Sequence, residues 1–193
     1  MQQEKNNLLR CDWAGSDPLY CRYHDEEWGQ PVHDDRKLFE MLILEGFQAG
    51  LSWITILRKR EAFRKAFKHF DWKKVSRFDE KDIERLLQNA DIIRNRRKIE
   101  AAVRNAQAFQ RLRQEFGTFD HYIWQFTDNR TIIPAKRAES FDTLPTHTPQ
   151  SDAMSRDLKK RGFSFVGTVI CYAFMQAIGM VDDHQRQCFK AIR

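Results

Sequence analysis

The chain has 193 residues, with 33 lysines and arginines against 27 aspartates and glutamates and a formal charge of +6. That length suits a single domain with a sizeable apolar core, and the moderate basic excess favours a polyanionic partner. No apolar run approaches a membrane span and the start lacks a secretion signal, so we expect a cytoplasmic protein that does not enter a membrane.

Apolar residues recur at helical spacing along most of the chain, and strand-like alternation never lasts more than a few positions. We therefore predict an all-α fold. Short polar residues of the type that caps helix N-termini precede several apolar stretches. In chain order, helices are predicted from Asp34 or Asp35 to near Gly46 or Gly50, over 53–67 behind Ser52, over 73–77 behind Asp71, over 81–88 behind Asp79, and from about Ile99 to Gly117.

The longest irregular stretch covers residues 128–150 and contains three prolines. It is the natural connection between two helical lobes, although the pattern does not require a domain boundary. Beyond it, Ser151 is expected to cap a basic amphipathic helix ending at Gly162, and an apolar helix over about 168–178 is expected in the core. We predict one helical domain over residues 1–193, of one or two lobes.

Two pairs of metal-binding residue types lie near opposite ends of the sequence, Cys11 with His24 and His184 with Cys188. The second pair has the spacing of one helical turn, whereas the first pair needs a folded loop to converge. Together the four could form a tetrahedral zinc site that joins the ends of the chain. On spacing alone, free thiols and surface imidazoles are the better interpretation, because the CxxC pairs of common zinc fingers are missing.

Glu45 falls on the helical stripe of Leu38, Met41 and Leu42, where an apolar side chain is expected. A buried carboxyl without a partner has a raised pKa, so a functional interpretation is a pocket acid that awaits a cationic or hydrogen-bonding ligand. The alternative, equally weighted from the stripe, is that the last turn of the helix is exposed to water.

Aromatic residues are frequent in the same third of the chain. Their faces stack planar ligands and attract cations, as an electron-poor ring would require. Ordinary core packing is the alternative, and for either Trp13 or Trp28 taken singly it is the better one. The residues concerned are Trp13, Tyr20, Tyr23, Trp28 and Trp53.

Residues 90–101 read ADIIRNRRKIEA, a helix end, a tight turn rich in arginine, and the start of a second helix. This is the outline of a helix-hairpin-helix, which points backbone N–H groups and a helix N-terminus at a DNA phosphate. A solvated basic face is the alternative, and the pattern alone slightly favours it.

Taken together, the chain resembles the DNA-3-methyladenine glycosylase I family over about residues 10–188. The matching motifs are long and in the right order. They are RCDW with DPLY, YHDEEWG, KLFEMLILEG with QAGLSWITIL, IIRNRRKI, SDAMSRDLKKRGFSFVG and CYAFMQAIGMVDDH. One departure is Asp91, which stands where the family frequently has a glycine at the head of the hairpin.

The resemblance implies a zinc-binding helix-hairpin-helix enzyme that removes 3-methyladenine from alkylated double-stranded DNA, with the hairpin at about residues 83–110. The family's zinc ligands fall on Cys11, His24, His184 and Cys188, a structural set because four protein ligands leave no open position for water. Its base-pocket residues fall on Glu45, Tyr23 and Trp53, with Tyr20 and Trp13 nearby.

The resemblance also implies DNA contacts. Gly50 and Leu51 fall where the family inserts backbone and side chain into the gap left by a flipped nucleotide. Further contacts are expected from the hairpin residues Arg94, Asn95, Arg96 and Lys98.

For the reaction, we expect the flipped base to stack against Tyr23 and Trp53 and to hydrogen-bond Glu45 while water attacks the sugar. The first alternative is a bifunctional glycosylase and lyase in which Lys98 forms a Schiff base. The second is a non-catalytic, zinc-stabilised DNA-binding module, in which Glu45 would have no task. We expect a monomer without a protein partner, since the sequence has no heptad seam.

Overall fold

The computed structural model describes residues 8–191, in which the regular secondary structure is helical apart from one isolated bridge between Ile132 and Val181. The prediction of an all-α fold is confirmed. None of the helices in this part of the chain has both the length and the apolar character needed to span a bilayer. The α-helices are α1 (Pro18–Glu26), α2 (Asp35–Gln48), α3 (Trp53–Ala66), α4 (Trp72–Val75), α5 (Glu80–Leu87), α6 (Arg96–Phe116), α7 (Phe119–Trp124), α8 (Pro149–Lys160) and α9 (Thr168–Ala177).

Helix starts follow the predicted caps with one exception. Asp34 caps α2 by accepting a hydrogen bond from the N–H of Lys37 at 2.9 Å. The exception is α8, which begins at Pro149 behind Thr148 rather than behind Ser151. Thr148 and Ser151 form a reciprocal capping box, so Ser151 is the third helical residue, and a proline fits the first position because its missing N–H is not needed there.

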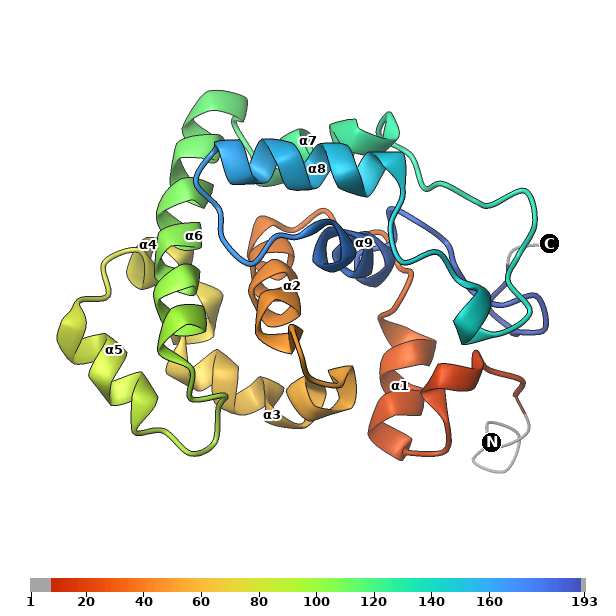
Figure 1. Cartoon of the computed structure of the whole chain (residues 1–193), viewed down its shortest axis with the longest axis horizontal. Coiled ribbons are helices and arrows are strands. Elements are labelled where there is room, and N and C mark those ends of the chain that lie inside the picture. The colour runs from red at the N-terminus through yellow and green to blue at the C-terminus, as the bar shows by residue number, and fades with distance from the viewer. Residues whose placement is uncertain (1–7, 192–193) are drawn as a thin grey trace.

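Helix α2 lies at the centre of the molecule and is packed by α3, α6, α7 and α9 (Figure 1). Its residues 38–47 are all buried, which explains the nearly unbroken apolar run there. The buried Glu40 is an exception with a partner, because Arg60 of α3 donates to it at 2.6 Å and also pairs with Glu27 at 2.9 Å. This ion pair network connects the end of α1 with α2 and α3.

The two ends of the described chain lie side by side. Phe189 donates its N–H to the carbonyl of Leu9 at 2.8 Å, and Asp12 and Gln185 exchange two hydrogen bonds of 2.7 Å. Asp12 also accepts the N–H of Phe141, in the long irregular segment, at 3.0 Å. Hydrogen bonds between the first and last described segments therefore bring them together, as predicted.

The end of α9 is held against the turn that follows α1. A Cβ at Gly179 would lie 2.4 Å from the carbonyl carbon of Gln30, and φ there is +74°, so only glycine allows this approach. Val32 donates its N–H to the carbonyl of Ile178 at 3.1 Å. These contacts bring α9 to the side of α1 and α2 that bears the candidate site.

Candidate active site and metal centre

A cavity of about 130 Å³ lies where α1, α2, α3 and α9 meet. The five residues predicted to form a base pocket all line it. The complete lining is Trp13, Tyr20, Tyr23, Trp28, Glu45, Gln48, Trp53, Phe141, Leu144, Ala173 and Gln176.

Glu45 is the carboxyl of this cavity. Its side chain is 3% exposed because α2 continues to Gln48, so the alternative of a water-exposed last turn is wrong. Burial raises the pKa of Glu45 to about 8, and desolvation is the cause. Its Oε2 atom is buried and has no hydrogen-bond partner in the described structure. Such an acid is costly for the fold, and a cation or donor in the cavity would satisfy it.

Tyr23 and Trp53 form an angled corner of the cavity. Their ring centroids are 5.4 Å apart and their planes meet at 48°, so a flat ligand would lie against one face and meet the other obliquely. Burial, followed by the Glu45 charge, raises the pKa of Tyr20 to about 12 and raises that of Tyr23 well above its usual value. Both phenols therefore remain neutral. The indole N–H of Trp53 is a second buried group that has no hydrogen-bond partner within residues 8–191.

An aromatic layer separates this cavity from the cysteines and histidines at the chain ends. Trp13 lies 4.9 Å from Tyr20 and 5.0 Å from Trp28, measured between ring centroids. On the other side, Trp13 lies 5.3 Å from His24, and Trp28 lies 4.7 Å from His184. The walls of the cavity thus rest directly on the candidate metal centre.

Three of the four predicted ligands converge. The ligand atoms of Cys11, His24 and Cys188 lie within 4.8 Å of one another, and all three residues are buried. A hydrogen bond from the Cys11 thiol is the largest cause that lowers the pKa of Cys188, which favours the Cys188 thiolate. A buried thiolate with a second thiol and an imidazole is a donor set that suits zinc.

His184 is adjacent to this group but outside it. Its ring centroid is 5.3 Å from that of His24, and its buried Nε2 has no hydrogen-bond partner among the described residues. Its Nδ1 lies 2.8 Å from Asp182, and Nδ1 of His24 lies 2.9 Å from Asp25, which orients each Nε2 for coordination. A Cβ at Gly29 would lie 2.6 Å from the His184 ring, so only glycine leaves room there.

The local geometry of the second ligand pair differs from the prediction. His184 and Cys188 lie in an irregular segment after α9 and not on a helical turn. The segment is shaped by hydrogen bonds to the N-terminal residues, such as the N–H of Gln185 donating to the sulfur of Cys11 at 3.3 Å.

The segment predicted to be the hairpin comprises α5, residues 88–95 and α6. The side chain of Asn95 caps α6 by accepting the N–H of Lys98 at 3.1 Å. Arg96 is held by Glu80 at 2.6 Å and by Glu84, so its guanidinium is already paired. Arg94 is exposed and forms no ion pair with any described residue.

The aspartate that departs from the family pattern causes no backbone strain. Asp91 is not among the described residues with positive φ, so the turn does not need a glycine there. Its own N–H is satisfied by the side chain of Asn89 at 3.0 Å. Lys59 of α3 donates to the carbonyls of Ala90 and Asp91 at 3.2 Å, which connects the turn to the rest of the fold.

Lys98 is turned inward. Its buried ammonium donates to the carbonyls of Phe47 at 2.8 Å and of Ala49 at 2.6 Å, at the C-terminal end of α2. A cation there complements the helix dipole, and desolvation lowers the pKa of the lysine. Lys98 therefore supports the turn that carries Gly50 (φ +78°) and the exposed Leu51, and it does not line the cavity.

The structure adds cavity residues that the sequence analysis missed. Phe141 and Leu144 come from the irregular segment, and Ala173 and Gln176 come from α9. The one sequence signal for these residues was Gln176, a polar residue in an otherwise apolar helix.

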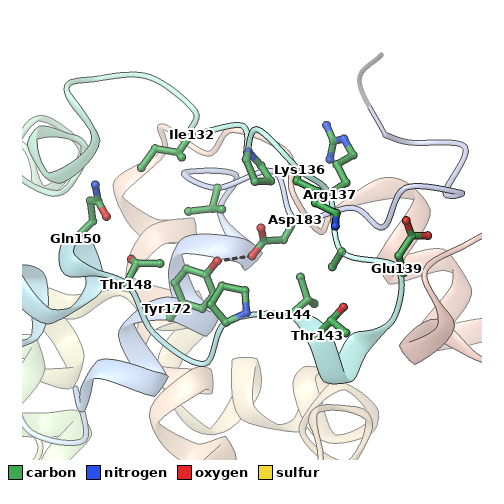
Figure 2. A pocket seen from close by; sticks show the side chains of 14 residues that line it. Ile132, Lys136, Arg137, Glu139, Thr143, Leu144, Thr148, Gln150, Tyr172 and Asp183 are labelled. Atoms are coloured by element: carbon green, nitrogen blue, oxygen red, sulfur yellow. Dashed lines mark hydrogen bonds between the residues drawn. The ribbon is translucent and has the colours of Figure 1, made fainter.

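A larger cavity of about 410 Å³ lies beyond Leu144, between the irregular segment and α9. It contains none of the predicted site residues (Figure 2).

Comparison of the fold places the chain among helical DNA glycosylases. A crystal structure described as 3-methyladenine DNA glycosylase I superposes with a TM-score of 0.92 at 53% identity, covering 95% of this chain and all of that one. A Staphylococcus aureus structure, described as the structural basis of 3-methyladenine recognition by the same type of enzyme, superposes with a TM-score of 0.90 at 36% identity, covering 95% and 97%.

The sequence comparison is equally extensive. DNA-3-methyladenine glycosylase 1 of Escherichia coli K12 is 51% identical over 181 residues, which is 94% of this chain and 96% of the relative. A family model described as methyladenine glycosylase matches residues 13–191. The chain belongs to the methyladenine glycosylase family, and the predicted resemblance is confirmed.

Proposed function

We propose that this protein is a monofunctional DNA glycosylase that flips 3-methyladenine out of alkylated double-stranded DNA and hydrolyses its glycosidic bond. The observation that carries the proposal is the buried, unpartnered carboxyl of Glu45 in a cavity walled by aromatic rings. Neutral purines offer no charge to satisfy that acid. A base methylated at N3 does, because it is cationic while it remains attached to the sugar.

The selectivity follows from recognition of this charge. Stacking a desolvated cation on Tyr23 or Trp53 contributes about 2 kcal/mol, and a charge-assisted hydrogen bond to Glu45 about 1.5 to 3 kcal/mol. Together these favour the cationic lesion over neutral adenine by several hundredfold. A cationic base also makes a good leaving group, so the protein need not protonate it, and the cavity serves mainly to bind and orient it.

We further propose that Cys11, His24, His184 and Cys188 hold one structural zinc ion. The donor set, the orphaned Nε2 of His184 and the two carboxylates behind the imidazoles support this assignment. When bound, the ion would cross-link the first and last segments of the chain. The residues themselves support Trp13 and Trp28, which form the wall of the cavity.

DNA would be bound across the side of the molecule that bears the α2–α3 turn and the hairpin at residues 83–110. Leu51 is an exposed apolar side chain beside the cavity-lining residues Gln48 and Trp53, where it could fill the gap left by a flipped base. Arg94 and the backbone at Asn95 and Arg96 would contact phosphate. Lys98 would support the inserted turn from below, and the chain would act as one helical domain and as a monomer.

The proposal is tested directly by incubating the protein with alkylated duplex DNA and measuring released bases. We expect 3-methyladenine to appear as a free base with abasic DNA left intact. Release of no base, with DNA binding preserved, would favour the non-catalytic DNA-binding module. The Glu45→Gln variant is the matched control, since it keeps the size and neutral hydrogen-bonding capacity of the side chain.

Lys98 allows the bifunctional alternative to be tested. We expect no covalent adduct with DNA after borohydride treatment, because the Lys98 amine is held by two carbonyls outside the cavity. We also expect Lys98→Met to lower the free energy of unfolding by about 1 to 3 kcal/mol, since the substitution leaves buried carbonyls without a donor.

For Lys98, Lys59→Met is the control, because that lysine also donates to two backbone carbonyls but from an exposed position. Its effect on stability should be smaller. A borohydride-trapped adduct that disappears in Lys98→Met, while the protein remains folded, would contradict the monofunctional assignment.

A further inference from the structure

Gln176 is a polar residue in the apolar helix α9. It lines the same cavity as Glu45. The buried residues of α9 are Cys171, Tyr172, Phe174, Met175 and Ala177. Gln176 beside them is half-buried, so its amide calls for a hydrogen-bonding partner.

The amide of Gln176 is held in one orientation by its partner. Its Nε2 donates to Oδ2 of Asp183 at 2.8 Å, and the hydroxyl of Tyr172 donates to the same oxygen at 2.5 Å. Figure 2 shows the Tyr172 hydroxyl directed at the Asp183 carboxylate from the side of the larger cavity. Asp183 is buried, and its carboxylate oxygens accept hydrogen bonds, so the amide nitrogen of Gln176 is the atom turned toward it.

The remaining polar atom of the amide is therefore an acceptor. With one N–H of Nε2 donated to Asp183, the amide is fixed, and its acceptor Oε1, to which no described residue donates, is available to a ligand in the cavity. Burial and the hydrogen bond to Asp183 raise the pKa of Tyr172, which keeps its hydroxyl a donor. Gln176 thus presents a carbonyl oxygen whose direction is fixed by a second residue.

A hydrogen-bond acceptor in a fixed position can distinguish two methylated bases that carry the same charge. Adenine and guanine methylated at N3 are both cationic nucleosides, so stacking and the Glu45 charge favour them similarly. They differ at C6, where adenine carries an amino donor and guanine a carbonyl acceptor. An amide oxygen facing that edge attracts the first and repels the second, and leaves the wrong base with an unpaired polar group.

We propose that Gln176, oriented by Asp183, is a specificity-determining residue that selects 6-amino over 6-oxo purines. The proposal rests on the glycosylase function proposed above and adds the group that reads the purine edge. Glu45 selects a cationic base, and Gln176 distinguishes adenine from guanine by the group at C6.

The test measures both lesions in one reaction. Duplex DNA treated with dimethyl sulfate carries 3-methyladenine and 3-methylguanine, and the rates of release of the two bases give their ratio of kcat/KM by internal competition. We expect Gln176→Met, which keeps the side-chain length and removes the acceptor, to lower the preference for 3-methyladenine at least tenfold. We expect Asp183→Asn to lower it by a smaller factor, since an amide at 183 can accept or donate and lets Gln176 turn.

Gln48→Met is the matched control, because Gln48 also lines the cavity but its side chain is held by no described hydrogen bond. Any change it causes should affect the two lesions in parallel and leave their ratio unaltered. Circular dichroism and metal content establish that each variant is folded, which matters for Asp183→Asn beside His184.

Failure of this inference is distinguishable from failure of the proposed function. If wild-type protein releases 3-methyladenine but Gln176→Met retains the full preference, Gln176 does not read the base and the glycosylase assignment stands. If Gln176→Met does not fold, the ratio for Asp183→Asn decides in the same way. If wild-type protein releases neither base, it is the proposed function that fails.

Discussion

Replacing Glu45 with glutamine is expected to reduce excision of 3-methyladenine at least tenfold and, at the same time, to make the protein more stable. The loss of activity follows from removal of the only carboxyl in the described cavity, a charge-assisted interaction worth about 1.5 to 3 kcal/mol. The gain in stability follows from desolvation, because the carboxyl is buried without a partner whereas an amide carries no charge to desolvate.

The stability effect of Glu45 has a defined pH window. Its pKa is raised from 4.5 to about 8 in the folded protein, so folding favours the neutral acid. The stability associated with the neutral Glu45 acid is complete below pH 4.5 and is lost as the pH rises toward 8, by at most about 5 kcal/mol. Glu45→Gln removes this dependence, so its advantage over the wild type should grow across that interval and then level off.

Glu40 on the same helix supplies a control with the opposite sign. Its carboxylate is also buried, but Arg60 and Arg64 pair with it and lower its pKa below the ordinary value. That group stabilises the fold above pH 4.5, and the contribution is lost as the pH falls through the depressed pKa. Glu40→Gln should therefore destabilise the protein at neutral pH, where Glu45→Gln stabilises it.

Denaturant unfolding of both variants between pH 5 and 9 measures the two effects. Equal stability of Glu45→Gln and wild type at pH 8 would show that the acid is not unpartnered. Undiminished release of 3-methyladenine by the variant would show that the acid is not part of the site.

Removal of the proposed zinc ion is expected to lower the stability of the fold by several kcal/mol. We expect native mass spectrometry to find one zinc per chain, and we expect Cys188→Ala to lose it. Binding at a thousandfold above Kd stabilises a protein by about 4 kcal/mol, which for a chain of this size lowers Tm by about 10 °C when the metal is removed. Activity should fall together with stability, because Trp13 and Trp28 rest on the histidines of the site.

Cys21→Ala is the control for the zinc site. Cys21 is half-buried on α1, and its sulfur lies 3.4 Å from the carbonyl oxygen of Gly15, outside the Cys11, His24 and Cys188 group. This variant should retain one zinc and nearly the wild-type Tm. Folded, active wild-type protein without zinc would reject the metal assignment.

Local sequence information predicted the helices well because helix periodicity and capping act over a few residues. Asp34, Asp71 and Asp79 each cap the helix predicted to follow them. The same locality explains the error at α8, where Thr148 and Ser151 are both acceptable caps and Pro149 between them decides in favour of Thr148. The resemblance to the family identified five pocket residues, and all five line one cavity in the structure.

The sequence by itself determined the helical class, the family and the identity of the acid and the aromatic rings. The tertiary structure decided which groups are left without partners. Glu40 and Glu45 are both acids in a buried helix, yet only packing against Arg60 distinguishes a paired carboxylate from an unpaired one. Likewise, the inward turn of Lys98 and the fixed amide of Gln176 depend on residues far away in the chain. Hydrogen bonding and desolvation are set by neighbours in space, and sequence spacing carries little information about them.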